Sequence, residues 1–310
     1  MKKRFTTAIC IVALGLSATA CGSSNTSTGG DEVTSVAENI DESITEESST
    51  DVTETETEST KTNSSPATIE ETVLLEQDGV VVKATKLDKD SIWGTELGIY
   101  VENNSDKNII VQAEDVSIND YMITQLFSAE VSAGKKTNDT MSFTKLDELG
   151  IDTIATIEMQ LKFVDPDSYS NLFTSEPIVI KTSAADSYTQ LDDDSGTVVY
   201  DEDGIKIIAR NDLSENSFGT GPVFFMTNNS DNGLIVQIDE FSVNGFMITP
   251  LFSATLPSNK KAIKSLDISS TNLEENSIEK IEEIEFIIKI ADINTYQTIK
   301  TSETITLTYE

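Results

Sequence analysis

The 310-residue chain has no histidine, only two cysteines and a single tryptophan. Without histidine it cannot form the Ser-His-Asp and Cys-His arrangements of nucleophilic catalysis. A Ser-Lys pair is compatible with the composition, but no S-x-x-K motif stands in the context of a nucleophile elbow. Two carboxylates can serve glycoside hydrolysis, yet among 54 acidic residues such pairs arise by chance. The sequence therefore predicts a protein that is not an enzyme and uses no cofactor or metal.

Basic residues are also scarce, because 21 lysines and arginines face 54 carboxylates and give a formal net charge of −33. A field of this sign repels phosphate backbones and anionic lipid headgroups, so nucleic acid is not an expected partner. The simplest consequence of the charge is solubility at a crowded surface.

The start of the chain is organised as a leader. "MKKR" is basic, and "FTTAICIVALGLSATA" is a short apolar run that ends in small residues. The run is too short, and too closely followed by polar sequence, to be a spanning helix. We therefore predict a signal peptide over residues 1–20, with Cys21 directly after it.

The stretch "LSATAC" resembles the lipobox of bacterial lipoproteins, although Ala18 stands where leucine is usual. The resemblance implies that the thiol of Cys21 is acylated, that Cys21 becomes the first residue after cleavage, and that lipid holds the protein on the membrane. The alternative is an ordinary secretory signal with an incidental cysteine. Cys10 lies in the part that would be removed, so no disulfide is expected within one mature chain.

Residues 21–71 have the composition of a disordered tether. Serine, threonine and glutamate dominate, aromatic residues are absent, and no apolar period persists. Such a segment buries too little surface to offset its chain entropy. A flexible chain of about 50 residues spans roughly 40 Å on average, which is enough to hold a domain clear of a membrane. Docking by the tether itself is the alternative.

The rest of the chain is an internal repeat. "NNSDKNIIVQAEDVSINDYMITQLFSA" begins at Asn103, "NNSDNGLIVQIDEFSVNGFMITPLFSA" begins at Asn228, and 16 of the 27 aligned positions are identical. "EQDGVVVKAT" and "DEDGIKIIAR" keep the same offset of 125 positions. A unit of this size is a whole domain, which predicts repeats over 72–183 and 197–310 and a joint over 184–196.

Within each repeat the apolar period is two. Ile157, Met159 and Leu161 alternate with Glu158 and Gln160, and "IEFIIKI" carries the same pattern in the copy. Alternation of this kind is typical of strands with one buried face. The pattern therefore predicts strands throughout both repeats.

Turn residues separate these strands. Asn244-Gly245 is a strong hairpin signal, Asn119-Asp120 is its weaker copy, and the duplicated "DG" and "NNSD" stretches mark further turns. Short helices are expected at Leu146–Leu149 and Leu273–Asn276. About seven short strands and one helical turn per repeat predict an all-β protein with two tandem immunoglobulin-like β-sandwich domains.

The order of a "DG" strand, a strand running into "NNSD", then "VQ", "S-x-N-x-F/Y-M" and "FSA" resembles the immunoglobulin-like domains of uncharacterised Gram-positive, clostridial-type surface lipoproteins. The resemblance covers both repeats. It implies an immunoglobulin-like fold and a lipid-anchored, extracellular location. Because those domains are mostly of unknown function, it implies no activity.

Two loops partly follow the ligand spacing of a calcium-binding EF-hand. "DPDSYSNLFTSE" starts at Asp165 and "DINTYQTIKTSE" starts at Asp292, each with glutamate at position 12. Position 5 is tyrosine, position 6 is not glycine, and no helices flank the loops. We therefore predict strand connections without Ca²⁺, in which Tyr169 and Tyr296 pack against the sandwich. Calcium binding is the alternative.

Several other groups have both a structural and a functional interpretation. The pairs Lys135-Lys136 and Lys260-Lys261 are expected in solvated loops, with an anion contact as the alternative. The acidic run around Asp192 is expected to be a charged joint. A third group is expected in the cores, with an aromatic binding ridge as the alternative: Tyr121, Met122, Phe127, Phe246, Met247 and Phe252.

Trp93 in "DSIWGTELG", replaced by Phe218 in the copy, is either a lid over the end of the core or an exposed contact. Together these expectations describe a membrane-anchored extracellular lipoprotein that acts as a non-enzymatic binding or display module at the cell envelope. The alternative is a small-ligand or Ca²⁺-binding accessory protein of an envelope system, and an envelope hydrolase is the third possibility.

Overall fold

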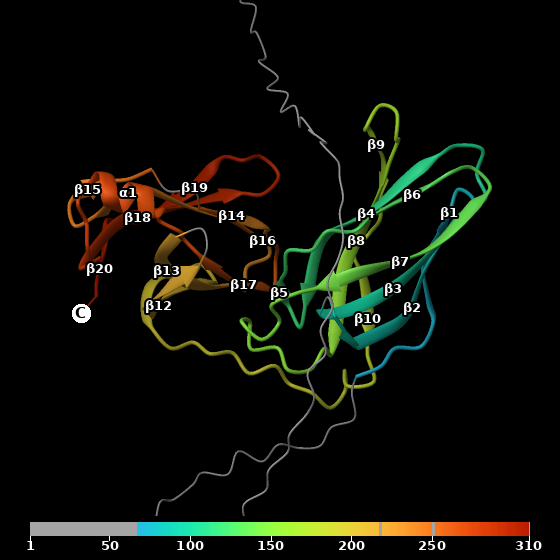
Figure 1. Cartoon of the computed structure of the whole chain (residues 1–310), viewed down its shortest axis with the longest axis horizontal. Helices are drawn as coiled ribbons and strands as arrows, with labels where there is room; N and C mark the ends of the chain where they lie inside the picture. Colours follow the sequence, from blue (N-terminus) through green and yellow to red (C-terminus); the bar gives the residue numbers. More distant parts are fainter. Residues whose placement is uncertain (1–66, 93, 217–218, 250–251, 310) are drawn as a thin grey trace, which may run out of the picture. The chain divides into compact units, whose positions relative to one another are not determined.

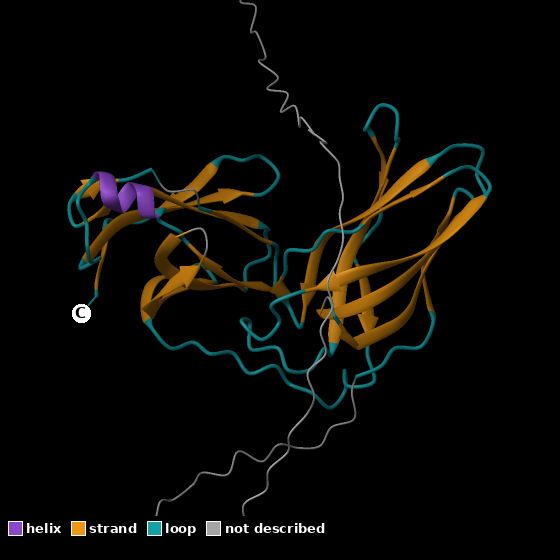
Figure 2. Ribbon diagram, viewed as in Figure 1, coloured by secondary structure: helices purple, strands orange, loops and turns teal. Residues whose placement is uncertain are grey.

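The computed structural model describes residues 67–92, 94–216, 219–249 and 252–309, all within one compact unit, Thr62–Glu310. Figure 1 traces the chain, and Figure 2 shows that strands and loops make up nearly all of this part. None of its helices has the length and apolar character needed to cross a membrane. The predicted leader, Cys21, Trp93 and Phe218 lie outside the described residues.

The first repeat forms two sheets from ten strands. One sheet has the order β1-β2-β3-β7; in the other, β10, β8 and β4 are neighbours, β9 pairs with β8, and β5 and β6 pair with β4. The strands are β1 (Thr72–Gln77), β2 (Val80–Ser91), β3 (Gly94–Asn103), β4 (Ile109–Ile118), β5 (Tyr121–Met122), β6 (Ser128–Val131), β7 (Lys135–Phe143), β8 (Thr156–Val164), β9 (Asn171–Thr174) and β10 (Ile178–Lys181).

The second repeat copies this arrangement. The strands β11-β12-β13-β17 continue the ten-stranded sheet that contains β4, because β17 pairs with β5; in the other sheet, β14 pairs with β15, β16 and β18, and β18 pairs with β19 and β20. The strands are β11 (Thr197–Glu202), β12 (Ile205–Asn216), β13 (Gly219–Asn228), β14 (Leu234–Val243), β15 (Phe246–Met247), β16 (Ser253–Leu256), β17 (Lys260–Ser265), β18 (Glu283–Asp292), β19 (Thr298–Thr301) and β20 (Ile305–Thr308).

Each repeat encloses a core between its two sheets, because alternate strand residues turn inward. Ile99 of β3 and Met159 of β8 share one core, and Phe224 of β13 and Phe286 of β18 share the other. All four are at most 1% exposed. The protein is thus all-β, with two tandem immunoglobulin-like sandwiches, as the period-two pattern predicts. Short added strands raise the count per repeat from the expected seven to ten.

The buried asparagines of the "NNSD" stretches are turn residues. Asn228 is 0% exposed, and its Nδ2 donates to the backbone carbonyls of Asn232 at 2.8 Å and Leu256 at 2.9 Å. Its Oδ1 accepts from the hydroxyl of Ser230 at 2.6 Å and from the N–H of the same residue at 3.0 Å. Asn103 makes the equivalent bonds in the first repeat. One amide therefore ties the end of β13 to the following turn and to β16.

Both predicted hairpins after β4 and β14 are confirmed. Asn244 and Gly245 have φ values of 49° and 81°, and Asn119 and Asp120 have 49° and 68°, so both turns are of the type that needs positive φ twice. The side-chain amide of Asn119 donates to the carbonyl of Thr153 at 2.7 Å, which holds the turn against the loop before β8.

The helix expectation holds only in the second repeat. Helix α1 (Ser270–Glu275) begins after Ser269, whose hydroxyl accepts from the N–H of Asn272 at 3.2 Å. In the first repeat the predicted helix at Leu146–Leu149 is wrong, because residues 146–150 form only a turn. The repeat offset grows by two residues in this connection, so the second copy has the extra length that a full helical turn requires.

The folded part begins before the predicted boundary at residue 72. Ala67 is 2% exposed, and the backbone N–H of Ser183 donates to the carbonyl of Thr68 at 2.8 Å. The last residues assigned to the tether therefore pack on the first sandwich. Because Ser183 also ends the first repeat, this contact joins its two ends.

We expect Asn228→Ala to lower the free energy of unfolding by about 2–4 kcal/mol, because it leaves buried carbonyl and N–H groups without partners. Asn229→Ala, at the exposed neighbouring position, is the matched control and should cost less than about 0.5 kcal/mol. Urea unfolding of both variants measures the difference. Equal costs would contradict the structural role of Asn228.

Candidate binding surfaces

Strand β13 is apolar on both of its faces. Phe224 and Met226 belong to the core of the second repeat, whereas Phe225 between them packs in the core cluster of the first repeat. Its ring lies 6.2 Å from the ring of Tyr121, with 27° between the planes, and Tyr121 is only 1% exposed. Ile208, the β12 neighbour of Phe225, is buried in the same cluster. We call this contact between the repeats the junction.

Backbone and charged groups complete the junction. The N–H of Lys261 donates to the carbonyl of Asp120 at 2.8 Å, and Lys261 pairs with Tyr121 as a parallel bridge between β17 and β5. The Nζ of Lys260 lies 3.2 Å from the Asp120 carboxylate and 3.0 Å from that of Glu158. The side chain of Lys260 is only 8% exposed. A cation this well covered needs both carboxylates.

The acidic joint supplies further partners. Asp192 accepts hydrogen bonds from the hydroxyl of Tyr121 at 2.9 Å and from the Nζ of Lys261 at 2.6 Å. Burial, followed by this hydrogen bond to Asp192, raises the pKa of Tyr121 above its ordinary value. The next two carboxylates face cations of β12, in the pairs Asp193–Arg210 at 2.6 Å and Asp194–Lys206 at 3.7 Å. The aspartates of the predicted charged joint therefore pair with the lysines and the arginine on one face of the second repeat.

These contacts correct the expectation for the lysine pairs. Lys260 and Lys261 lie in strand β17 and in the junction, not in a solvated loop. Lys135 and Lys136 start strand β7 and are exposed. The sequence did contain a sign of the junction, because Ile208 and Phe225 interrupt the period of two, whereas their copies Lys83 and Tyr100 do not.

Of the six candidate core residues, three are buried, Met122 is partly buried, and two are exposed. Tyr121, Phe127 and Phe252 are buried, as predicted. Phe246 and Met247 are 46% and 69% exposed, so the core prediction is wrong for this pair. The physical reason is that their copies Tyr121 and Met122 are covered by the second repeat, and no described residue covers Phe246 in the same way. The aromatic tip is thus buried in one copy and exposed in the other.

The two calcium-like loops use their first carboxylate to close a turn. Oδ1 of Asp165 accepts from the N–H of Ser168 at 2.8 Å and from its hydroxyl at 2.9 Å, and Asp292 does the same with Thr295. These hydrogen bonds, from the backbone first and then from the hydroxyl, hold the pKa of Asp165 below its usual value. Among the described residues, no three acidic, cysteine or histidine side chains are grouped to hold a metal ion.

The tyrosines of these loops do not pack on the sandwich. Tyr169 and Tyr296 are each 76% exposed, which overturns the expectation from the sequence. Both have positive φ, of 55° and 59°, because the preceding aspartate closes a tight turn. The turn carries the tyrosine away from the strands on either side of it.

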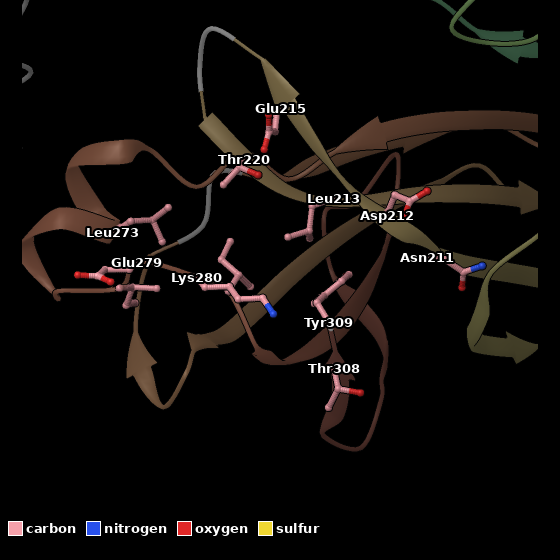
Figure 3. A pocket seen from close by; sticks show the side chains of 12 residues that line it. Asn211, Asp212, Leu213, Glu215, Thr220, Leu273, Glu279, Lys280, Thr308 and Tyr309 are labelled. Carbon is pink, nitrogen blue, oxygen red and sulfur yellow. The ribbon is translucent and has the colours of Figure 1, made fainter.

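The second repeat also contains a cavity of about 680 Å³ (Figure 3). Its walls come from β12, β13, α1, the segment after α1, and the end of the chain. Leu213, Leu273 and Ile281 contribute apolar surface, and Figure 3 shows Lys280 and Tyr309 among the residues of its wall. The volume falls in the range of small-molecule sites.

The polar groups of this cavity do not form a catalytic set. Asp212, Glu215 and Glu279 contribute carboxylates and Lys280 a single cation. No hydrogen bond joins a nucleophile to a base among these lining residues, and the chain has no histidine to serve as one. The hydroxyl of Tyr309 has no hydrogen-bond partner among the described residues. Burial raises the pKa of Tyr309 to about 12.

No protein-family model and no curated protein matches the chain. Among solved structures it is similar to a chain in the CsuC–CsuE chaperone–tip adhesion subunit pre-assembly complex from the archaic chaperone–usher Csu pili of Acinetobacter baumannii. The identity is 10%, the TM-score is 0.19, and the match covers 69% of this chain and 92% of the other. A similarity at this level carries no argument about function.

We expect Lys260→Met to lower the free energy of unfolding by about 1–2 kcal/mol, because Asp120 and Glu158 keep their charges without the cation between them. Lys135→Met removes the equivalent, exposed lysine of the first repeat and should cost less than about 0.5 kcal/mol. Chemical unfolding monitored in both variants checks this. A cost for Lys260→Met no larger than for Lys135→Met would show that the junction ion pairs contribute nothing.

The raised pKa of Tyr309 predicts a loss of stability at high pH. The unfolded chain ionises this phenol near its ordinary value of 10.0, whereas the folded chain keeps it protonated to about 12. Its stabilising effect is therefore complete below pH 10 and is lost as the pH rises to 12. Tyr309→Phe should flatten the decline of unfolding free energy across this window, and Tyr296→Phe, at an exposed site, should not. An unchanged decline in Tyr309→Phe would argue against burial of this group.

Proposed function

We propose that this protein is a lipid-anchored, extracellular protein of a bacterial cell membrane that displays two immunoglobulin-like sandwiches as a non-enzymatic binding module. The envelope would be of the Gram-positive type, in line with the resemblance to surface lipoproteins. In this proposal residues 1–20 are the signal peptide and residues from Cys21 onward form an acidic tether. The repeats at 72–183 and 197–310, with the joint at 184–196, are the displayed part.

The exposed tip at Phe246 and Met247 is the observation that carries the binding role. The equivalent tip is covered in a contact between two sandwiches, in which Tyr121 is buried and Met122 is partly buried. The second tip exposes 46% of the phenylalanine and 69% of the methionine. An aromatic and a thioether side chain at the end of a hairpin suit a protein interface, where such residues are enriched.

The polar groups that line the described cavity are compatible with the non-enzymatic part of the proposal. The cavity of the second repeat has carboxylates and one lysine, but no hydrogen-bonded nucleophile and base. The pKa shifts of the aspartates at the loop turns come from structural hydrogen bonds. Asp165 and Asp292 therefore stabilise turns.

The anchor is supported by the order of the leader, in which Cys21 directly follows a short apolar run and precedes a long polar segment. A single acyl chain binds a membrane only marginally, so stable anchoring would need more than one chain on this residue. The highly acidic composition disfavours electrostatic attachment to anionic lipid, and lipid is therefore the stronger means of attachment.

We expect Cys21→Ser to move the protein from the membrane fraction to the medium in a bacterial host that processes lipoproteins. Cys10→Ser is the matched control, because it changes the only other cysteine, inside the predicted leader, and should leave the protein in the membrane fraction. Cell fractionation with immunoblotting measures both. Membrane retention of Cys21→Ser, or equal release of both variants, would defeat the anchor.

A further inference from the structure

The internal duplication gives each sandwich two complementary surfaces. One is the tip, which is Tyr121-Met122 in the first repeat and Phe246-Met247 in the second. The other is the docking face, which is the outward surface of β12, β13 and β17 in the second repeat and of β2, β3 and β7 in the first. The junction joins the first tip to the second docking face. The tip of the second repeat and the docking face of the first repeat take no part in the junction.

The two docking faces have the same strand register. Phe225 is paired with Ile208 on one side and with Ile263 on the other. Tyr100 is paired in the same way with Lys83 and with Asn138. Tyr100 therefore occupies in the first repeat the place from which Phe225 contacts the tip.

The charged groups of the junction are also duplicated. Lys135 and Lys136 pair with the end of β3 just as Lys260 and Lys261 pair with the end of β13. Both lysines of the first repeat are exposed. On the side of the tip, Glu285 pairs with Ser242 as Glu158 pairs with Ser117. The free docking face thus carries three lysines, because Lys83, which pairs with Glu71 and lies 5.8 Å from the centre of the Tyr100 ring, adds to Lys135 and Lys136. The free tip has a carboxylate beside it.

We propose that the Phe246-Met247 tip of one copy of this chain docks on the first-repeat docking face of a second copy, which repeats the junction between molecules. Phe246 lies on Tyr100, Lys136 takes the position over its ring that Lys261 takes over Tyr121, and Lys135 pairs with Glu285. In the junction the Nζ of Lys261 is 5.5 Å from the centre of the Tyr121 ring, which is the geometry of a cation–π contact.

This contact between copies is weaker than the junction. The free docking face has Lys83 and Asn138 where the junction has Ile208 and Ile263, and Gly245 stands where Asp120 supplies a carboxylate. The junction also benefits from the covalent joint, which makes its contact intramolecular. Association of copies therefore depends on protein concentration.

The contact is heterologous, because the two copies contribute different surfaces. Each bound copy still offers a free tip at one end and a free docking face at the other, so association leads to open rows rather than closed dimers. The inference names the partner of the tip on which the proposed function rests. It does not depend on the lipid anchor, because the experiment uses the protein in solution.

The test is crosslinking between two single-cysteine versions of the full chain, each also carrying Cys10→Ser and Cys21→Ser. One version has Met247→Cys at the tip, and the other has Asn138→Cys on the docking face. With a short bifunctional thiol reagent, the mixture should form crosslinked dimers at least roughly tenfold faster than a control mixture of Tyr296→Cys with Asn138→Cys, because docking raises the local thiol concentration. Met247→Cys alone should crosslink no faster than the control.

Charge reversal checks the ion pair without touching the aromatic contact. Adding Lys135→Glu to the Asn138→Cys version should reduce crosslinking to the control rate, because it faces Glu285 of the other copy. Glu285→Lys in the Met247→Cys version should then restore it. Lys181→Glu, an exposed lysine on the other sheet of the first repeat, makes the same charge change and should have no effect.

Two outcomes overturn the proposal. If the tip and docking-face thiols react no faster than the control pair at high protein concentration, the second copy is not the partner. If Met247→Cys crosslinks to itself as fast as to Asn138→Cys, the contact is symmetric and the copied junction is wrong. Either result leaves the lipid anchor standing, because that is tested by Cys21→Ser alone.

Discussion

The whole arrangement of the two repeats depends on one strand that is buried on both faces. Strand β13 gives Phe224 and Met226 to its own core and Phe225 to the contact with Tyr121. Its copy β3 has Tyr100 at the same position, beside Lys83, and remains partly exposed. A strand with two apolar faces is stable only between two layers. The second sandwich therefore requires the first as a cover, whereas the first does not require the second in the same way.

The ion pairs of the junction depend on that apolar contact. Once Tyr121 meets Phe225, strand β17 comes within hydrogen-bonding distance of β5, and Lys260 is covered by groups of the first repeat. A covered cation is tolerated because Asp120 and Glu158 are both within 3.2 Å. The three consecutive aspartates of the joint then match the cations of the same face. Cations are few in a chain with a net charge of −33, yet several of them lie together on this face. The acidic joint therefore has a structural role, because its aspartates pair with these cations.

The sequence predicts the long strands and the hairpin turns because the duplication shows these local patterns twice, whereas the helix expected at Leu146–Leu149 does not form. The alternation at Ile157 and Ile284 predicts the central strands, and Asn244-Gly245 predicts its hairpin without any tertiary information. The surfaces were harder, because exposure depends on what covers a residue. Tyr121 and Phe246 occupy the same place in the same hairpin, yet one is 1% and the other 46% exposed. In the sequence, the apolar residues Ile208 and Phe225, which replace Lys83 and Tyr100 of the first copy, indicate that the two repeats are unequal.

That inequality changes the meaning of the duplicated stretch. If both tips were core residues, the repeat would be a scaffold and any binding site would lie elsewhere. Since one tip is covered in the junction and the other is exposed, the duplication itself supplies the surface on which the proposed binding role rests. A tandem contact of this kind has a fixed direction, from the tip of one sandwich to the sheet of the next. The second repeat therefore exposes, at Phe246 and Met247, a copy of the tip that in the first repeat contacts a sheet of the same construction.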